Sequence, residues 1–112
     1  MRKQRFKYTY DLIRYLLQDF EMLIMDESLA NVDETTKEKI ILKIQAMFPD
    51  RSFLYISHNV VEVAKYCDQI LVLRSHHKQP QAVSLQGQDF DGRQLLQDSN
   101  LEQCMLEIVN AA

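Results

Sequence analysis

Three short runs of consecutive apolar residues stand out along the chain, at positions 22–25, 53–56 and 70–73. The first run, Met22-Leu23-Ile24-Met25, leads directly into Asp26 and Glu27. A short apolar run without alternation is typical of a strand that is buried on both faces of a parallel sheet. We therefore predict three buried strands, at Met22–Asp26, Phe53–Ile56 and Gln69–Arg74.

Helical spacing of apolar residues appears before the first strand and again after it. The earlier pattern predicts an amphipathic helix over about residues 5–18, and the later one predicts a helix with Asp33 as its N-cap. Phe6, Tyr10, Ile13 and Leu17 carry the earlier pattern, and Ile40, Ile41, Ile44, Met47 and Phe48 are expected on the inner side of the later helix.

The region after the second strand contains weaker patterns. Asn59 and Glu62 have the capping-box spacing, which predicts a short helix through Tyr66. Farther along, we expect a short strand at Ala82–Leu85, a loop at Gly87–Gly92, and one or two short helices over Leu95–Val109 with a break near Ser99-Asn100.

Strands that alternate with helices over short links predict an α/β fold, with a parallel sheet flanked by helices and right-handed crossovers. The 112 residues are enough for a single domain, residues 1–112. Parallel strands end at the same edge of their sheet, and open α/β sheets bind ligands there. We therefore expect Asp26 and Glu27 to lie near His58, which follows the second strand.

Composition and charge narrow the function classes. The apolar share of 46% and the charged share of 26% are those of an ordinary globular protein, and a net charge of −3 gives no reason to expect nucleic acid as a partner. No stretch approaches the ~20 apolar residues of a membrane span, and no signal-peptide core follows the basic start. Cys67 and Cys104 show neither metal-ligand spacing nor a disulfide framework. These features predict a soluble domain of the cytoplasm.

Two adjacent carboxylates at the end of a buried strand suit a nucleotide-hydrolysing site. One can hold Mg²⁺, usually through water, while its neighbour orients an attacking water. Taken alone, each residue has a simpler interpretation: Asp33 is typical of a helix cap, and His58 of a polar residue at a strand-to-helix turn. Their order on successive strands is more specific than any one of them.

The span from Gln4 to Leu73 resembles the carboxyl-terminal half of an ATP-binding cassette (ABC) ATPase, the motor domain of ABC transporters. Leu23–Glu27 is similar to its Walker B motif, Ser28–Asp33 to its D-loop, and Ser57–Asn59 to its H-loop. Lys3-Gln4-Arg5 is similar to the residues just after its signature motif, and Cys67–Leu73 to the last strand of its catalytic core. The resemblance thus implies a partial P-loop NTPase-like core over residues 1–74 and a strand-and-helix tail over 75–112.

The resemblance also implies roles for five residues. Asp26 would hold Mg²⁺ through water, Glu27 would polarise the hydrolytic water, and His58 would contact the γ-phosphate of ATP. Asp33 and Ser57 would belong to the nucleotide-binding part of the site, with Asp33 near the interface of an ATP-sandwiched dimer. Mg²⁺ and ATP are the cofactors implied for the complete cassette.

The phosphate loop of such ATPases is absent from these residues. It requires G-x-x-x-x-G-K-[ST], whose backbone N–H groups and lysine hold the phosphates, but the only glycines are Gly87 and Gly92, followed by Arg93. The Leu-Ser-Gly-Gly-Gln signature is absent too. We therefore expect no tight binding of Mg·ATP and no ATPase activity by the chain alone.

The absent phosphate loop also affects the predicted fold. In the family, its strand lies between the strands matching Phe53–Ile56 and Gln69–Leu73, so a gap with unpaired backbone groups is expected there. The two strands could close up, a partner could fill the space, or the chain could be only marginally folded.

Three functional hypotheses follow. The chain is a fragment of an ABC transporter ATPase that completes its site with an amino-terminal cassette half, or a non-enzymatic module that binds an intact cassette, or half of an SMC-like ATPase head. Against the last, no coiled-coil heptads precede the motifs. For the first, the expected partners are the complementary half or a second cassette and a transporter membrane domain, and the expected location is the inner face of a membrane.

Overall fold

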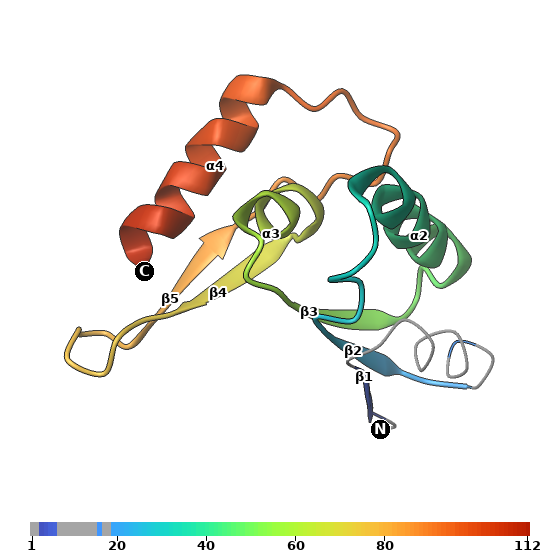
Figure 1. Cartoon of the computed structure of the whole chain (residues 1–112), viewed down its shortest axis with the longest axis horizontal. Coiled ribbons are helices and arrows are strands. Elements are labelled where there is room, and N and C mark those ends of the chain that lie inside the picture. Colours follow the sequence, from blue (N-terminus) through green and yellow to red (C-terminus); the bar gives the residue numbers. More distant parts are fainter. Residues whose placement is uncertain (1–2, 7–15, 17–18) are drawn as a thin grey trace. The chain divides into compact units, whose positions relative to one another are not determined.

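The computed structural model describes residues 3–6, 16 and 19–112, which fall into two compact units (Figure 1). Unit 1 comprises residues 1–58 and unit 2 comprises residues 59–112. In chain order the elements are β1 (Lys3–Phe6), β2 (Met22–Asp26), α2 (Glu34–Met47), β3 (Ser52–Ile56), α3 (Val60–Tyr66), β4 (Gln69–Leu73), β5 (Ala82–Gln86) and α4 (Asp98–Ala111).

Unit 1 is built on a three-stranded parallel sheet in the order β1-β2-β3. β2 has the predicted bounds, β3 begins one residue before its predicted start, and the two pair in parallel from Met22↔Ser52 to Asp26↔Ile56. The α/β fold with a parallel sheet is therefore confirmed for this unit. Helix α2 lies on one side of the sheet (Figure 1).

The core of unit 1 lies under α2. The Phe20 ring, 1% exposed, packs against Phe48 at the end of α2, with ring centroids 5.0 Å apart, and against Phe53 of β3 at 6.3 Å. Such tilted aromatic contacts add to the stabilisation from burial. The buried apolar residues of this unit are Phe20, Leu23, Met25, Leu29, Ile41 and Ile44.

Met47 does not join this core, although the pattern predicts it there. It is 59% exposed, whereas Lys37, Ile41 and Ile44 form the buried stripe of α2. At 100° per residue, Met47 lies about a quarter turn from the centre of that stripe. Its position at the last residue of the helix removes any later turn that could cover it.

Strand β1 departs from the prediction of a helix over residues 5–18. Arg5 and Phe6 lie in β1 and pair with Ile24 and Met25 of β2. This parallel ladder satisfies backbone groups along β2 that an edge position would leave unpaired. Leu16 is helical, whereas Tyr10, Ile13 and Leu17 lie outside the described residues.

The third predicted strand belongs to a different sheet. β4 ends at Leu73 and pairs antiparallel with β5, from Gln69↔Gln86 to Leu73↔Ala82, so it does not extend the parallel sheet of unit 1. The turn between them is closed by a hydrogen bond from the Arg74 N–H to the Gln81 carbonyl, 2.7 Å long. The eight residues between these strands, 74–81, can join antiparallel strands but not parallel ones, because a parallel connection needs a crossover of a dozen or more residues.

The prediction that β3 and β4 are buried on both faces is wrong. Both strands alternate between covered and exposed residues, and the exposed ones include Leu54 and Ile56 of β3 and Leu71 and Leu73 of β4. Alternation is typical of a sheet that is covered on one face. Within each unit, the described helices cover a single face of the sheet.

Unit 2 packs its two helices on one side of the β4–β5 hairpin (Figure 1). Asn59 caps α3 as predicted, since its side chain accepts a hydrogen bond from the Glu62 N–H and donates one to the Glu62 carboxylate, both 3.2 Å. The Cys104 thiol points from α4 toward the carbonyls of Ala64 and Gln86, at 3.9 and 3.6 Å. The core residues are Ala64, Ile70, Val72, Cys104 and Ile108.

Helix α4 is one continuous helix, without the predicted break near Ser99-Asn100. Those residues lie in its first turn, where the N–H groups of Asn100 and Leu101 both donate to the Gln97 carbonyl, at 3.1 Å each. Serine and asparagine are unfavourable in the middle of a helix but favourable at its start. Within the described residues, no helix is both long and apolar enough to cross a membrane.

Gly87 permits a close backbone approach at the end of β5. A Cβ atom at this position would lie 2.0 Å from the Cys67 carbonyl oxygen, and the Gly87 N–H donates to the Asp68 carbonyl at 2.9 Å. No larger residue fits without moving one of the two chain segments. Gly87 therefore fixes the distance between β5 and the end of α3.

We expect Gly87→Ala to lower the free energy of unfolding by about 2 kcal/mol, because overpacking of a well-fitted site has costs of that order. Urea unfolding followed by circular dichroism measures the change. Ser84→Ala, at an exposed position of β5, is the matched control and should change stability by less than about 0.5 kcal/mol. Equal stabilities of the two variants would contradict the close approach.

Candidate functional site

The candidate site lies at the carboxyl ends of β2 and β3, within unit 1. Asp26, the last residue of β2, is paired with Ile56, the last residue of β3. Glu27 continues from one strand, and Ser57 and His58 continue from the other. The parallel register therefore brings both predicted groups of polar residues to one edge of the sheet.

Glu27 sits at a sharp change of backbone direction. Its N–H donates to the Ile56 carbonyl at 3.0 Å, which extends the pairing of β2 and β3 by one residue. Its φ is +58°, in the left-handed region that residues with a Cβ rarely adopt. The chain then turns, with the Ala30 N–H donating to the Glu27 carbonyl at 3.1 Å. A conformation of this kind persists only where its surroundings hold it, and such conformations concentrate at functional sites.

The burial of the next two residues holds Glu27 in this left-handed conformation. Ser28 is 2% exposed and Leu29 is 1% exposed, although they stand in a mainly polar stretch of sequence. Leu29 anchors the turn in the apolar core, which restricts where the Glu27 side chain can point. Sequence reasoning missed this anchor, and its one signal was a leucine isolated between polar residues.

The two residues predicted to be catalytic are in contact. Oε1 of Glu27 accepts a hydrogen bond from the backbone N–H of His58 at 3.0 Å and lies 3.8 Å from Nε2 of the His58 ring. The His58 side chain is fully exposed, and that of Glu27 is 37% exposed. A side-chain contact this exposed stabilises the fold little, so the backbone hydrogen bond is what orients the carboxylate.

Asp26 and Ser57 flank this pair along the chain, and both are half-buried. Among the described residues, no group of three or more histidine, cysteine, aspartate or glutamate side chains could hold a metal ion. Mg²⁺ does not need such a group, because it keeps several waters and takes one or two carboxylates together with substrate phosphates. A single carboxylate such as Asp26 fits that mode of binding, with the phosphates supplied by the nucleotide.

Asp33 serves as the N-cap of α2, as predicted. Its Oδ2 accepts a hydrogen bond from the Thr36 N–H at 3.1 Å. This bond, followed by the Thr36 hydroxyl, lowers the pKa of the Asp33 carboxyl below its usual value. The role of Asp33 at a nucleotide-bound interface stays a prediction.

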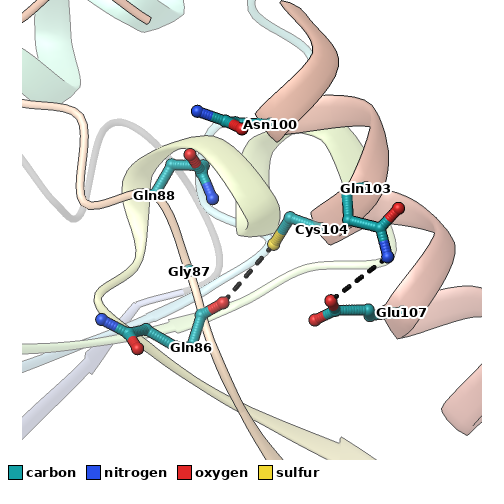
Figure 2. A pocket seen from close by; sticks show the side chains of 7 residues that line it. All are labelled: Gln86, Gly87, Gln88, Asn100, Gln103, Cys104 and Glu107. Atoms are coloured by element: carbon teal, nitrogen blue, oxygen red, sulfur yellow. Dashed lines mark hydrogen bonds between the residues drawn. The ribbon is translucent and has the colours of Figure 1, made fainter. Parts of the chain in front are cut away.

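A separate hollow of about 450 Å³ lies in unit 2, between the end of β5 and α4 (Figure 2). Four carboxamide side chains line it together with Gly87, Cys104 and the Glu107 carboxylate. Burial raises the pKa of the Cys104 thiol, with Glu107 adding to the effect. The lining contains one acid and no lysine or arginine, so it lacks the positive charge that a phosphate site uses. The carboxamides belong to Gln86, Gln88, Asn100 and Gln103.

Several curated proteins are similar in sequence to this chain. The molybdenum import ATP-binding protein ModC of Saccharophagus degradans is 39% identical over 66 residues, which cover 57% of this chain and 18% of that protein. ModC of Rhizobium johnstonii is 29% identical over 88% of this chain and 34% of its own length. The lactococcin-G-processing and transport ATP-binding protein LagD of Lactococcus lactis is 37% identical over 55% of this chain and 8% of its own length.

These similarities to ATP-binding proteins of transporters are consistent with a partial ABC ATPase domain. The chain spans about a third or less of each of these relatives. No family model and no solved structure matches it. The similarity is compatible with the small α/β unit of parallel sheet and helices that the structure shows.

We expect Asp33→Ala to destabilise the chain at neutral pH and Asp33→Asn to retain most of the stability, because asparagine keeps a capping oxygen. The pKa of Asp33 is lowered in the folded state. The Asp33 charge therefore contributes fully to folding stability above the unfolded-state pKa near 3.8. This contribution is lost as the pH falls through the lower folded-state pKa. Urea midpoints at pH 7 and in strong acid measure this.

Asp50→Ala, in the exposed turn before β3, is the control. If Asp33→Ala lowers the urea midpoint by the same amount at both pH values, the charge of the cap is not the cause of the destabilisation.

Proposed function

We propose that this chain supplies the Walker B, D-loop and H-loop part of an ABC transporter ATPase, whose hydrolysis of ATP drives transport across a membrane. The observation that carries the proposal is the contact of Glu27 with His58 at the carboxyl ends of two adjacent parallel strands. The order of these residues along the chain and the similarity to ABC ATP-binding proteins support the same assignment.

In this proposal each residue has one task. Asp26 holds Mg²⁺ through water, and the bound ion would offset the negative charge of the ATP phosphates. Glu27 orients the attacking water and accepts its proton. His58 contacts the γ-phosphate, which its full exposure allows. Ser57 and Asp33 lie with the nucleotide and with the partner surface that closes over it.

The contact with His58 does not exclude Glu27 from this task. An ionised carboxylate has about four acceptor positions on its two oxygens, and the His58 N–H uses one of them. The backbone hydrogen bond keeps the carboxylate at the sheet edge, and the left-handed turn at Glu27 keeps its Cα there. Orientation is fixed before substrate arrives, which is where much of the catalytic effect of such sites arises.

The phosphate loop must come from elsewhere, because these 112 residues contain no G-x-x-x-x-G-K sequence. We propose that a complementary amino-terminal cassette half provides it, together with the strand expected beside β3. The exposed apolar residues Leu54 and Ile56 of β3 support this, since a covering element would bury them. A second cassette and a transporter membrane domain at the inner face of a membrane complete the proposed assembly.

We expect Glu27→Gln to lower ATP turnover at least ~100-fold in a mixture with a cassette amino-terminal half, and to leave ATP-dependent association intact. Glutamine keeps an oxygen that can accept the His58 N–H but cannot take a proton from water. Phosphate release measures turnover, and analytical ultracentrifugation measures association. Glu102→Gln on α4, which is exposed, is the control. Undiminished turnover would remove Glu27 from the role of water activator.

We expect the isolated chain to bind Mg·ATP with a dissociation constant no lower than about 1 mM, or about −4 kcal/mol, because the groups that hold phosphate are absent. Isothermal titration calorimetry on the folded chain tests this. Micromolar binding would mean that other residues of this chain hold the phosphates.

A further inference from the structure

Leu29 is the side chain that attaches the turn after β2 to the rest of unit 1. It is 1% exposed and is the only buried apolar residue among residues 27–33. The hydrogen bonds of the turn are local, such as the one from the Ala30 N–H to the Glu27 carbonyl, 3.1 Å long. A bond within a turn moves with the turn and does not fix it to its surroundings. Burial of Leu29 in a close-packed interior does fix it.

The conformation that this attachment supports is one that Glu27 disfavours. Its φ of +58° lies in the left-handed region, where a Cβ atom crowds the backbone. If the turn loosens, the Glu27 backbone relaxes toward negative φ. Its N–H is bonded to the Ile56 carbonyl at the end of the sheet, so the relaxation changes the direction of the side chain and of the residues that follow.

The hydrogen bond between the Glu27 carboxylate and the His58 N–H depends on that direction. It is 3.0 Å long and joins two segments that leave neighbouring strands. The Glu27 side chain is 37% exposed, so water competes for the carboxylate as soon as its geometry changes. Leu29 therefore controls this bond from inside the core, although it takes no part in the bond.

We propose that Leu29 is a positioning residue for Glu27, and that its burial holds the carboxylate in the orientation that ATP hydrolysis requires. The consequence for turnover rests on the proposed function, whereas the effect on the His58 N–H is a property of the isolated chain. Leu29 is buried away from nucleotide and Mg²⁺. Its loss should therefore lower kcat and leave the KM for ATP nearly unchanged.

Hydrogen exchange followed by NMR on the isolated chain tests the structural part. In Leu29→Ala, the His58 amide should exchange at least ~10-fold faster relative to the amides of the β2–β3 ladder, because its hydrogen bond opens more often. Leu29→Met fills nearly the same volume and should exchange like the unmodified chain.

Ile44→Ala is the matched control for lost packing. Ile44 is 6% exposed on α2, so its truncation also removes a buried apolar side chain from unit 1, outside the turn. It should leave the relative exchange of the His58 amide unchanged. Circular dichroism establishes that each variant is folded, and Leu29→Val replaces Leu29→Ala if the alanine variant is not.

Steady-state ATP hydrolysis in a mixture with a cassette amino-terminal half tests the consequence for turnover. Leu29→Ala should lower kcat at least ~10-fold, since a small misplacement of a catalytic group has effects of that order or larger. The KM for ATP should change by less than about twofold. Leu29→Met should restore kcat, and Ile44→Ala should retain it.

The results that overturn the inference differ from the one that overturns the proposed function. An unchanged His58 amide in Leu29→Ala, or one that Ile44→Ala exposes equally, would show that Leu29 does not hold the carboxylate. Faster exchange with an unchanged kcat would show that turnover does not need this orientation. A mixture without any turnover would count against the proposed function, and the exchange rates would still decide whether Leu29 positions Glu27.

Discussion

The parallel pairing of β2 with β3 is the constraint on which the candidate site depends. Its last rung joins Asp26 to Ile56, and the Glu27 N–H adds one more hydrogen bond to the Ile56 carbonyl. A slip of one residue in this register would move the Glu27 side chain to the opposite face and away from the His58 N–H. Leu23 and Met25 prevent that slip because both are buried. The packing of two apolar residues thus fixes the position of a carboxylate at the sheet edge.

Local signals in the sequence predicted much of unit 1 and the beginnings of two helices. The apolar run before Asp26 gave the bounds of β2, and the caps Asp33 and Asn59 gave the starts of α2 and α3, because each signal acts through neighbouring residues alone. The convergence of Glu27 with His58 followed from the parallel topology. The roles of these residues in binding and hydrolysis stay predictions.

The remaining features depend on contacts that no local pattern encodes. β1 forms because an edge of β2 is available for pairing, and its own sequence, Lys3-Gln4-Arg5-Phe6, has no strand periodicity. β4 resembles a strand of a large parallel sheet, yet its nearest partner in the chain, β5, follows after an eight-residue loop, and the two form an antiparallel hairpin. An apolar run shows that a strand is suited to burial, but the neighbouring elements decide how many of its faces are covered.

The environment of Cys104 links the reactivity of its thiol to the opening of unit 2. Cys104 is 3% exposed, and its thiol lies against the carbonyls of Ala64 and Gln86. Burial raises the pKa of the other cysteine, Cys67, to about 11, so neither thiol is an effective nucleophile in the closed unit. We therefore expect an alkylating reagent to modify Cys104 faster when α4 separates from the hairpin than while it is docked. The rate of its modification is therefore expected to rise with the undocking of that helix.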